Sequence, residues 1–232
     1  DLLRVTTIAS LLPLAIGSLP SEILNSLVAH VVDPREFNTP IPLPTVSRSD
    51  PLFLKDTWRG PVWVNTAWMV LFGLGLNGKD DITGDFAYRL VKGVYETRAK
   101  CGSFYEFYDP DGPTLAGLHR KQGNLGKKIT LGDKPIHNFC GWTALVNTIL
   151  LENILGYARN AGVVILKPHL PAHWRNVTFY VTIPQFGEEI EMHVPSSGEL
   201  TAKILVSSRN VPETGSVFYF QGQNHTELRR IN

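Results

Sequence analysis

Residues 61–76 read PVWVNTAWMVLFGLGL, and this stretch decides how the rest of the chain is interpreted. Pro61 suits the first turn of a helix, because the N–H that proline lacks has no partner there. The residues that follow are apolar on nearly every side of such a helix, a pattern typical of a helix that is buried all round. Burial on all sides needs other helices around it. We therefore expect a helical domain with this segment inside it.

The neighbouring segments predict further helices joined by long loops. Ser21 can cap a helix, and residues 82–99 and 140–158 show helical apolar patterns. A Pro-rich loop precedes residues 61–76, whereas compact helical bundles have short connections. The helices of residues 1–160 are too few to cover one another. We therefore expect an incomplete helical domain, whose remaining helices lie on a preceding segment or a separate chain.

The sequence pattern changes after residue 160. Apolar and polar residues alternate over 177–183, and again around Ile190 and Ile204. Alternation with a period of two predicts half-buried antiparallel strands. The chain is therefore expected to be mainly α, with a small β-domain appended over residues 161–232.

Composition argues against several classes of partner. The net charge is +1 at pH 7 and no run of Lys or Arg occurs, which disfavours nucleic acid and anionic membranes. The apolar stretches are interrupted too early to span a bilayer. No cluster of His, Asp and Glu has the spacing of a metal site, so neither a metal nor a cofactor is expected.

Cysteines and glycosylation sequons bear on the compartment. Cys101 and Cys140 are too few for a disulfide scaffold and are expected to be free or buried thiols, with one bridge as the alternative. Asn176-Val-Thr and Asn224-His-Thr are N-glycosylation sequons, which favour a secreted or lumenal protein of the endoplasmic reticulum or vacuole. The chain begins at Asp1 rather than Met, and we expect this to be a point of proteolytic processing.

The loop before residues 61–76 carries the first candidate site. Trp58 offers a flat apolar face and Arg59 a planar fork of donors, a combination that suits a polyhydroxylated ring. Gly60 allows close approach of the backbone. An alternative stays open, in which the Arg pairs with a carboxylate such as Asp56 beside core tryptophans.

The second candidate is Glu106, which stands among aromatic residues in Phe104-Tyr105-Glu106-Phe107-Tyr108, just before the turn Asp109-Pro110-Asp111-Gly112. A carboxylate in such a setting can serve as a general base, although an isolated surface Glu is the alternative. A third segment, Gly141-Trp142-Thr143, adds another indole at the start of the last predicted helix.

These three segments, in this order, resemble glycoside hydrolase family 63 and its relatives in clan G. That group includes processing α-glucosidases, glucosylglycerate and mannosylglycerate hydrolases, and trehalases. The segments Ser47-Arg48-Ser49-Asp50-Pro51 and Asp33-Pro34-Arg35-Glu36-Phe37 are similar to family segments as well. The resemblance implies that residues 1–160 are the carboxyl-terminal half of an (α/α)6 barrel. Residues 161–232 are similar to the β-sandwich domains appended to such barrels.

The resemblance also implies roles for individual residues. Glu106 would be the general base of an inverting hydrolysis. The sugar would be bound by Trp58, Arg59, Gly60, Trp63, Tyr108, Trp142 and Phe37. The general acid would be an aspartate on an upstream segment that this sequence does not contain. Inverting hydrolysis uses two carboxyls roughly 6.5–9.5 Å apart, and we assign the nearby Asp50 and Asp56 structural roles.

The expected function is therefore an inverting glycoside hydrolase that acts on an α-glucoside or a related oligosaccharide. Its expected partners are that sugar and an amino-terminal chain of the same precursor, which completes the barrel. Two alternatives stay open: a catalytically inactive sugar-binding protein on a glycosidase scaffold, and another (α/α)6-barrel enzyme such as a terpenoid cyclase or a sugar epimerase.

Overall fold

The computed structural model describes residues 4–160, 163–171, 173–174, 176–183, 188–196, 201–206, 218–220 and 229–231. The chain divides into two compact units, Asp1–Leu150 and Leu151–Asn232. This boundary precedes the predicted one at residue 160, because the strand Tyr157–Asn160 already belongs to the second unit. None of the described helices has the length and apolarity needed to cross a membrane.

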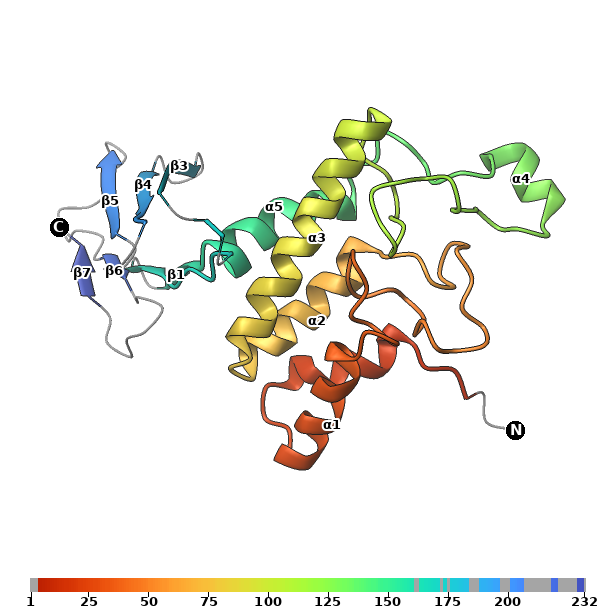
Figure 1. Ribbon diagram of the computed structural model, residues 1–232, viewed down its shortest axis with the longest axis horizontal. Coiled ribbons are helices and arrows are strands. Elements are labelled where there is room, and N and C mark those ends of the chain that lie inside the picture. Colours follow the sequence, from red (N-terminus) through yellow and green to blue (C-terminus); the bar gives the residue numbers. More distant parts are fainter. Residues whose placement is uncertain are drawn as a thin grey trace. The chain divides into compact units, whose positions relative to one another are not determined.

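The first unit is helical, and Figure 1 shows its helices linked by long loops. Its elements are a 3-10 helix η1 (Ile8–Ile16), α1 (Ser21–Val32), α2 (Val64–Leu76), α3 (Asp80–Cys101), α4 (Leu125–Leu131), η2 (Trp142–Ala144) and α5 (Leu145–Ile149), after which a π-helical turn η3 (Leu150–Ile154) follows. The predicted helix 140–158 is thus broken into short pieces and ends at Ile154. Ser21 is the first residue of α1 but does not cap it, because Pro20 occupies the capping position.

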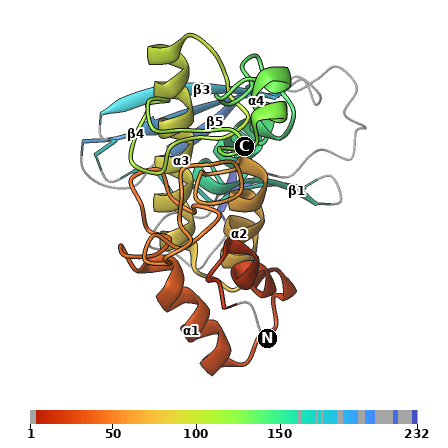
Figure 2. The same cartoon turned by 90° about the vertical axis from the view of Figure 1, so that its right-hand side faces the viewer.

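Helix α2 is buried on one side rather than all round. Ala67, Val70, Leu71 and Leu74 are buried, and they face η1, α3 and α5. Met69 and Phe72, on the other side, are 40% and 44% exposed. The described helices thus pack against only part of the α2 surface (Figure 2), and burial of its other side by a further segment stays a prediction.

Close backbone approach fixes α2 against η1. A Cβ built on Gly73 would lie 2.7 Å from the carbonyl carbon of Leu14, which is too close for two carbon atoms. The Asn77 side chain donates to the carbonyl of the same Leu14 at 2.8 Å. The absence of a side chain at Gly73 is therefore what lets the two helices meet.

Helix α3 is amphipathic as predicted, with Phe86, Leu90 and Val94 buried. Between α1 and α2 lies the expected Pro-rich loop, which forms isolated β-bridges rather than strands. One bridge joins Pro44 to Val62, and a second joins Val62 to Tyr108. The loop is therefore held by backbone hydrogen bonds to distant parts of the first unit.

The second unit consists of strands. They are β1 (Tyr157–Asn160), β2 (Val163–Leu166), β3 (Val177–Ile183), β4 (Glu188–Val194), β5 (Thr201–Val206), β6 (Phe218–Phe220) and β7 (Arg229–Ile231). Strands β3, β4 and β5 form a small antiparallel sheet. The predicted alternation is present on β4, where Ile190, Met192 and Val194 are buried.

The other sheet of the second unit has the order β1-β2-β6-β7. Its β2 and β6 strands pair in parallel, with Val164 opposite Phe218. The expectation of purely antiparallel strands is wrong for this pair. A parallel pair needs a long crossover connection, and the chain between β2 and β6 is long enough to provide one. The packing of two sheets into a sandwich stays a prediction.

Substituting Ala for Gly73 should lower the free energy of unfolding by about 1–3 kcal/mol, because the added Cβ collides with the backbone of η1. Gly75 provides the matched control, since a Cβ at this position meets no atom within 4 Å. Gly75→Ala should be neutral or stabilising by up to about 1 kcal/mol, the helix preference of Ala over Gly. Urea denaturation followed by circular dichroism measures both values. Equal effects of the two substitutions would contradict the packing described here.

Candidate active site

The three segments singled out in the sequence come together through their backbones. Val62 and Tyr108 exchange two hydrogen bonds, each N–H donating to the other's carbonyl at 2.9 Å. The Trp142 indole N–H donates to the carbonyl of Glu106 at 2.9 Å. The Thr143 hydroxyl donates to the carbonyl of Tyr105 at 2.7 Å. The segment around Glu106 is therefore held from both sides, by the loop before α2 and by the start of η2.

Three other aromatic rings cluster around Trp63, and one of them belongs to Trp142, which donates to the Glu106 carbonyl. Trp58 and Trp63 stack with their centroids 3.7 Å apart and their planes 14° apart. Trp63 also lies 5.2 Å from Phe107 and 5.3 Å from Trp142, again between ring centroids. Trp58 is the outermost of these rings, being 48% exposed, whereas Trp63 is buried. The indole of Trp58 is thus exposed to solvent while it stacks on the buried indole of Trp63.

Glu106 itself is buried, with 5% of its surface exposed. Its Oε1 accepts a hydrogen bond from Nη2 of Arg120 at 3.2 Å. Its Oε2 is buried and has no hydrogen-bond partner among the described residues. An unsatisfied buried acceptor is unfavourable, so each one needs a reason, and a catalytic role or a bound water molecule is among the usual ones.

The other buried carboxylates of the described residues differ from Glu106 in this respect. Asp56 accepts hydrogen bonds from the backbone N–H groups of Lys121 and Gln122. Asp109 accepts from Lys55 at both oxygens, at 2.7 and 2.8 Å. Both oxygens are therefore occupied in these two acids, which serve as structural anchors. Glu106 alone of the three keeps an oxygen free.

The loop that carries Trp58 and Arg59 contains no ion pair between Asp56 and Arg59, which the sequence had left possible. The Asp56 carboxylate is taken up by residues 121–122, and the exposed Arg59 side chain has no ion pair with any described residue. Gly60 has a φ of 136°, and a Cβ there would lie 2.3 Å from the carbonyl oxygen of Leu54. The close approach expected at Gly60 is thus to its own loop.

Phe37 and Tyr108 lie deeper than the sequence led us to expect. Both are fully buried, so neither ring faces solvent in this chain. The Tyr108 hydroxyl accepts from the backbone N–H of Tyr105 at 3.1 Å. Burial raises the pKa of Tyr108 to about 12, with hydrogen bonds from Tyr105 and Thr143 acting in the opposite direction. Tyr108 is therefore a neutral packing residue beneath the Glu106 segment.

A charged cluster ties the loop before α2 to the turn after Glu106. Lys55 binds Asp109 and Asp111, and Arg48 binds Asp111 as well. Burial on its own would lower the pKa of Lys55, but hydrogen bonds to the two aspartates raise it overall. Burial would likewise raise the pKa of Asp111, and its bonds to Lys55 and Arg48 lower it instead. These charges are mutually satisfied and hold the loop in place.

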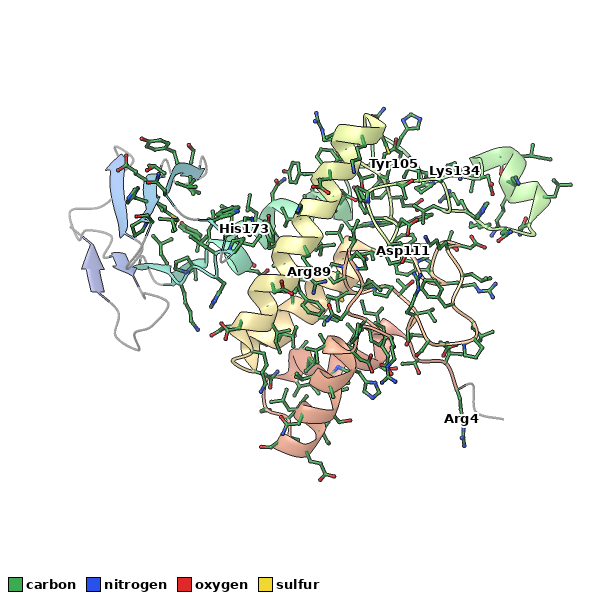
Figure 3. All side chains as sticks on the ribbon, viewed as in Figure 1. Arg4, Arg89, Tyr105, Asp111, Lys134 and His173 are labelled. Atoms are coloured by element: carbon green, nitrogen blue, oxygen red, sulfur yellow. The ribbon has the colours of Figure 1, made fainter. Side chains whose placement is uncertain are left out.

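Arg120 is the residue of this site that sequence reasoning missed. It lies in the polar segment Leu118-His119-Arg120-Lys121-Gln122, which shows no periodicity and no recognisable motif. Its side chain is 11% exposed and reaches Glu106 across the loop. In Figure 3, the labels Tyr105 and Lys134 mark the chain before and after the segment that contains Arg120. No sequence signal distinguishes Arg120 from the other basic residues of the segment.

Metal binding has no support in the described part of the chain, where no group of three or more His, Cys, Asp or Glu side chains is placed to hold an ion. Cys101 and Cys140 are free cysteines, in agreement with the sequence-based expectation. The groups available for chemistry are therefore the Glu106 carboxylate, the Arg120 guanidinium and the aromatic rings beside them.

Comparisons with known proteins place these residues in a family. The probable mannosyl-oligosaccharide glucosidase of Schizosaccharomyces pombe is 29% identical over 158 residues, which cover 62% of this chain and 17% of that protein. An uncharacterized protein of Borreliella burgdorferi is 24% identical over 190 residues, which cover 78% of this chain and 36% of that protein. The chain thus spans well under half the length of either relative.

Among solved structures, the GH63 mannosylglycerate hydrolase of Thermus thermophilus in complex with glucose is 31% identical, with a TM-score of 0.40. The match covers 50% of this chain and 28% of that one. The family model described as the mannosylglycerate hydrolase MGH1-like glycoside hydrolase domain matches residues 1–123. Because this match takes in more than half of the 232 residues, the chain belongs to the MGH1-like glycoside hydrolases, within glycoside hydrolase family 63.

Proposed function

We propose that this chain is part of an inverting glycoside hydrolase that acts on an α-glucoside or a related oligosaccharide, with Glu106 as its general base. One observation carries the proposal. In a chain of this hydrolase family, Oε2 of the buried Glu106 has no partner among the described residues, and the Glu106 carbonyl accepts from the indole of Trp142, a member of the aromatic cluster. A general base needs such a free acceptor within reach of the proton it removes.

The proposed reaction is a single displacement at the anomeric carbon. Oε2 of Glu106 accepts a proton from a water molecule as the water oxygen bonds to that carbon. The bond from the carbon to the glycosidic oxygen breaks, and a second carboxyl group donates a proton to the leaving oxygen. Attack from the face opposite the leaving group converts an α-glycoside into a β-configured sugar.

The proposed sugar contacts fall into two groups. Trp58 and Arg59 are exposed and Trp142 is partly exposed, so these three can touch a ring directly through C–H stacking and hydrogen bonds. The other predicted binding residues, Trp63, Tyr108, Phe37 and Gly60, are buried and shape the site from behind.

The general acid is proposed to come from a further polypeptide segment, either upstream in the same precursor or on a partner chain. The same segment would cover the exposed apolar side of α2, where Met69, Phe72 and Leu76 are 40% to 49% exposed. Large apolar side chains grouped on one helix face favour burial against another element. Together the two pieces would complete an (α/α)6 barrel, to which this chain would contribute its first unit, Asp1–Leu150.

N-glycosylation and a secreted or lumenal location belong to the same proposal. Asn176 is exposed at the start of β3, where an oligosaccharide can be attached without burying polar groups. Asn224, the second sequon, lies outside the described residues.

Substituting Gln for Glu106 should lower kcat by about 100- to 10,000-fold, because an amide cannot accept the proton of the attacking water. Mannosylglycerate, glucosylglycerate and an α-glucosyl oligosaccharide serve as substrates. The sugar released by the variant is compared with that released by the native protein. Glu96→Gln is the matched control, since this half-exposed glutamate lies on α3 and pairs only loosely with Lys92 at 3.9 Å. Unchanged turnover by the Glu106 variant would exclude it as the base.

The same experiment separates catalysis from binding alone. In Glu106→Ala, azide should restore turnover and yield the β-glycosyl azide, because this anion attacks without a base. Proton NMR of the first-formed sugar from the unmodified protein should show the β-anomer. A protein that binds these sugars, yet releases none even before mutation, would instead be the inactive sugar-binding protein.

Replacing Trp58 with Leu should raise KM by about tenfold, equivalent to about 1.4 kcal/mol of lost stacking, and leave kcat nearly unchanged. The indole is expected to bind the substrate and the transition state alike, which confines its effect to KM. Tyr180→Leu removes an exposed aromatic ring from β3 and is the control. A fall in kcat with constant KM would show that Trp58 acts on the chemistry rather than on binding.

A further inference from the structure

The Arg120 guanidinium contacts the Glu106 carboxylate through one nitrogen only. Nη2 donates to Oε1 at 3.2 Å, while Nε and Nη1 are buried and have no partner among the described residues. Arginine and carboxylate groups that serve as structural ties commonly meet through two parallel hydrogen bonds. Both Glu106 and Arg120 thus have buried polar atoms that form no hydrogen bond with the described residues, whereas a pair with a purely structural role is expected to satisfy them.

The backbone of Arg120 is held firmly although its loop has no regular structure. Its own N–H donates to the carbonyl of Asp133 at 2.7 Å. The preceding His119 donates to the carbonyl of Lys55 at 2.7 Å, and the next two N–H groups bind the buried carboxylate of Asp56. The chain therefore presents the Arg120 side chain from a fixed point toward Glu106.

The anchors of Arg120 belong to the stretch that also carries the aromatic site. Lys55 and Asp56 directly precede Thr57, whose N–H donates to the carbonyl of His119 at 3.1 Å and whose carbonyl accepts from the Trp63 indole at 2.9 Å. The position of the guanidinium is thus tied to that of the indole rings. This linkage would keep the Glu106 carboxylate at a constant position relative to the exposed indole face of Trp58.

We propose that Arg120 is the positioning residue of the general base. By holding Oε1 alone, it turns the carboxylate so that Oε2 stays free for the attacking water, and its two spare donors can bind an oxygen atom next to that water. This inference rests on the proposed function of Glu106. Fixing a reacting group in this way contributes to kcat, because misplacement by about 1 Å can cost on the order of 100-fold in rate.

Arg120→Gln should accordingly lower kcat by about 100-fold and change KM by less than about threefold. Arg120→Lys should retain more activity than Arg120→Gln, because an ammonium group can still donate to Oε1, although without the fork. The substrates are mannosylglycerate, glucosylglycerate and an α-glucosyl oligosaccharide, assayed with the native protein. Thermal unfolding of each variant verifies that it is folded.

Lys134→Met is the matched control for loop order. Its Nζ donates to the carbonyls of Leu115, Ala116 and Leu118 at 3.1, 3.0 and 2.9 Å, so it stabilises the same loop without touching Glu106. This variant should keep nearly normal kcat. An equal loss in Lys134→Met would show that order of the loop, rather than the contact with Glu106, sets the rate, and would overturn the proposal.

A double variant shows whether Arg120 acts through Glu106. If it does, adding Arg120→Gln to Glu106→Gln should cause no further loss of kcat, whereas independent effects multiply. Multiplied losses, or normal kcat in Arg120→Gln alone, would overturn the proposal. If Glu106→Gln itself turns over normally, the assignment of the base has failed instead, so the two failures are distinguishable.

Discussion

The pairing of Val62 with Tyr108 is the contact on which the site depends. Two backbone hydrogen bonds at 2.9 Å join the loop before α2 to the segment that carries Glu106. Trp63 follows the first of these residues and Phe107 precedes the second, so the pairing brings their rings to 5.2 Å. Since main-chain atoms make the connection, the side chains on either side remain available for packing and for chemistry.

The sequence singled out this candidate site through residue types that are seldom combined for other purposes. An Arg-Gly-Pro turn between two tryptophans, and a Glu enclosed by aromatics, each pointed to sugar chemistry, and the structure places them side by side. Arg120 could not be found in this way. Its side chain meets Glu106 across fourteen positions of irregular chain, in a loop anchored on Asp56, and no periodicity or motif encodes such a contact.

The fold was predictable where a pattern reflects local burial. The period of α3 and the alternation on β4 both matched, because each of these elements buries one face within its own unit. The prediction for α2 is met on one side only, because the described helices cover Ala67, Val70, Leu71 and Leu74 and leave Met69 and Phe72 partly exposed.

Buried carboxylates in this chain follow two different rules. Asp56 and Asp109 have both oxygens bonded, which is the arrangement that costs least in a protein interior. Glu106 is as deeply buried but keeps one oxygen without a partner among the described residues, next to an arginine with two unused donors. An apolar residue would avoid that cost at this position. Departures of this kind from good packing are expected where a protein uses the group for chemistry. The activity then depends on keeping the group buried despite the cost in stability.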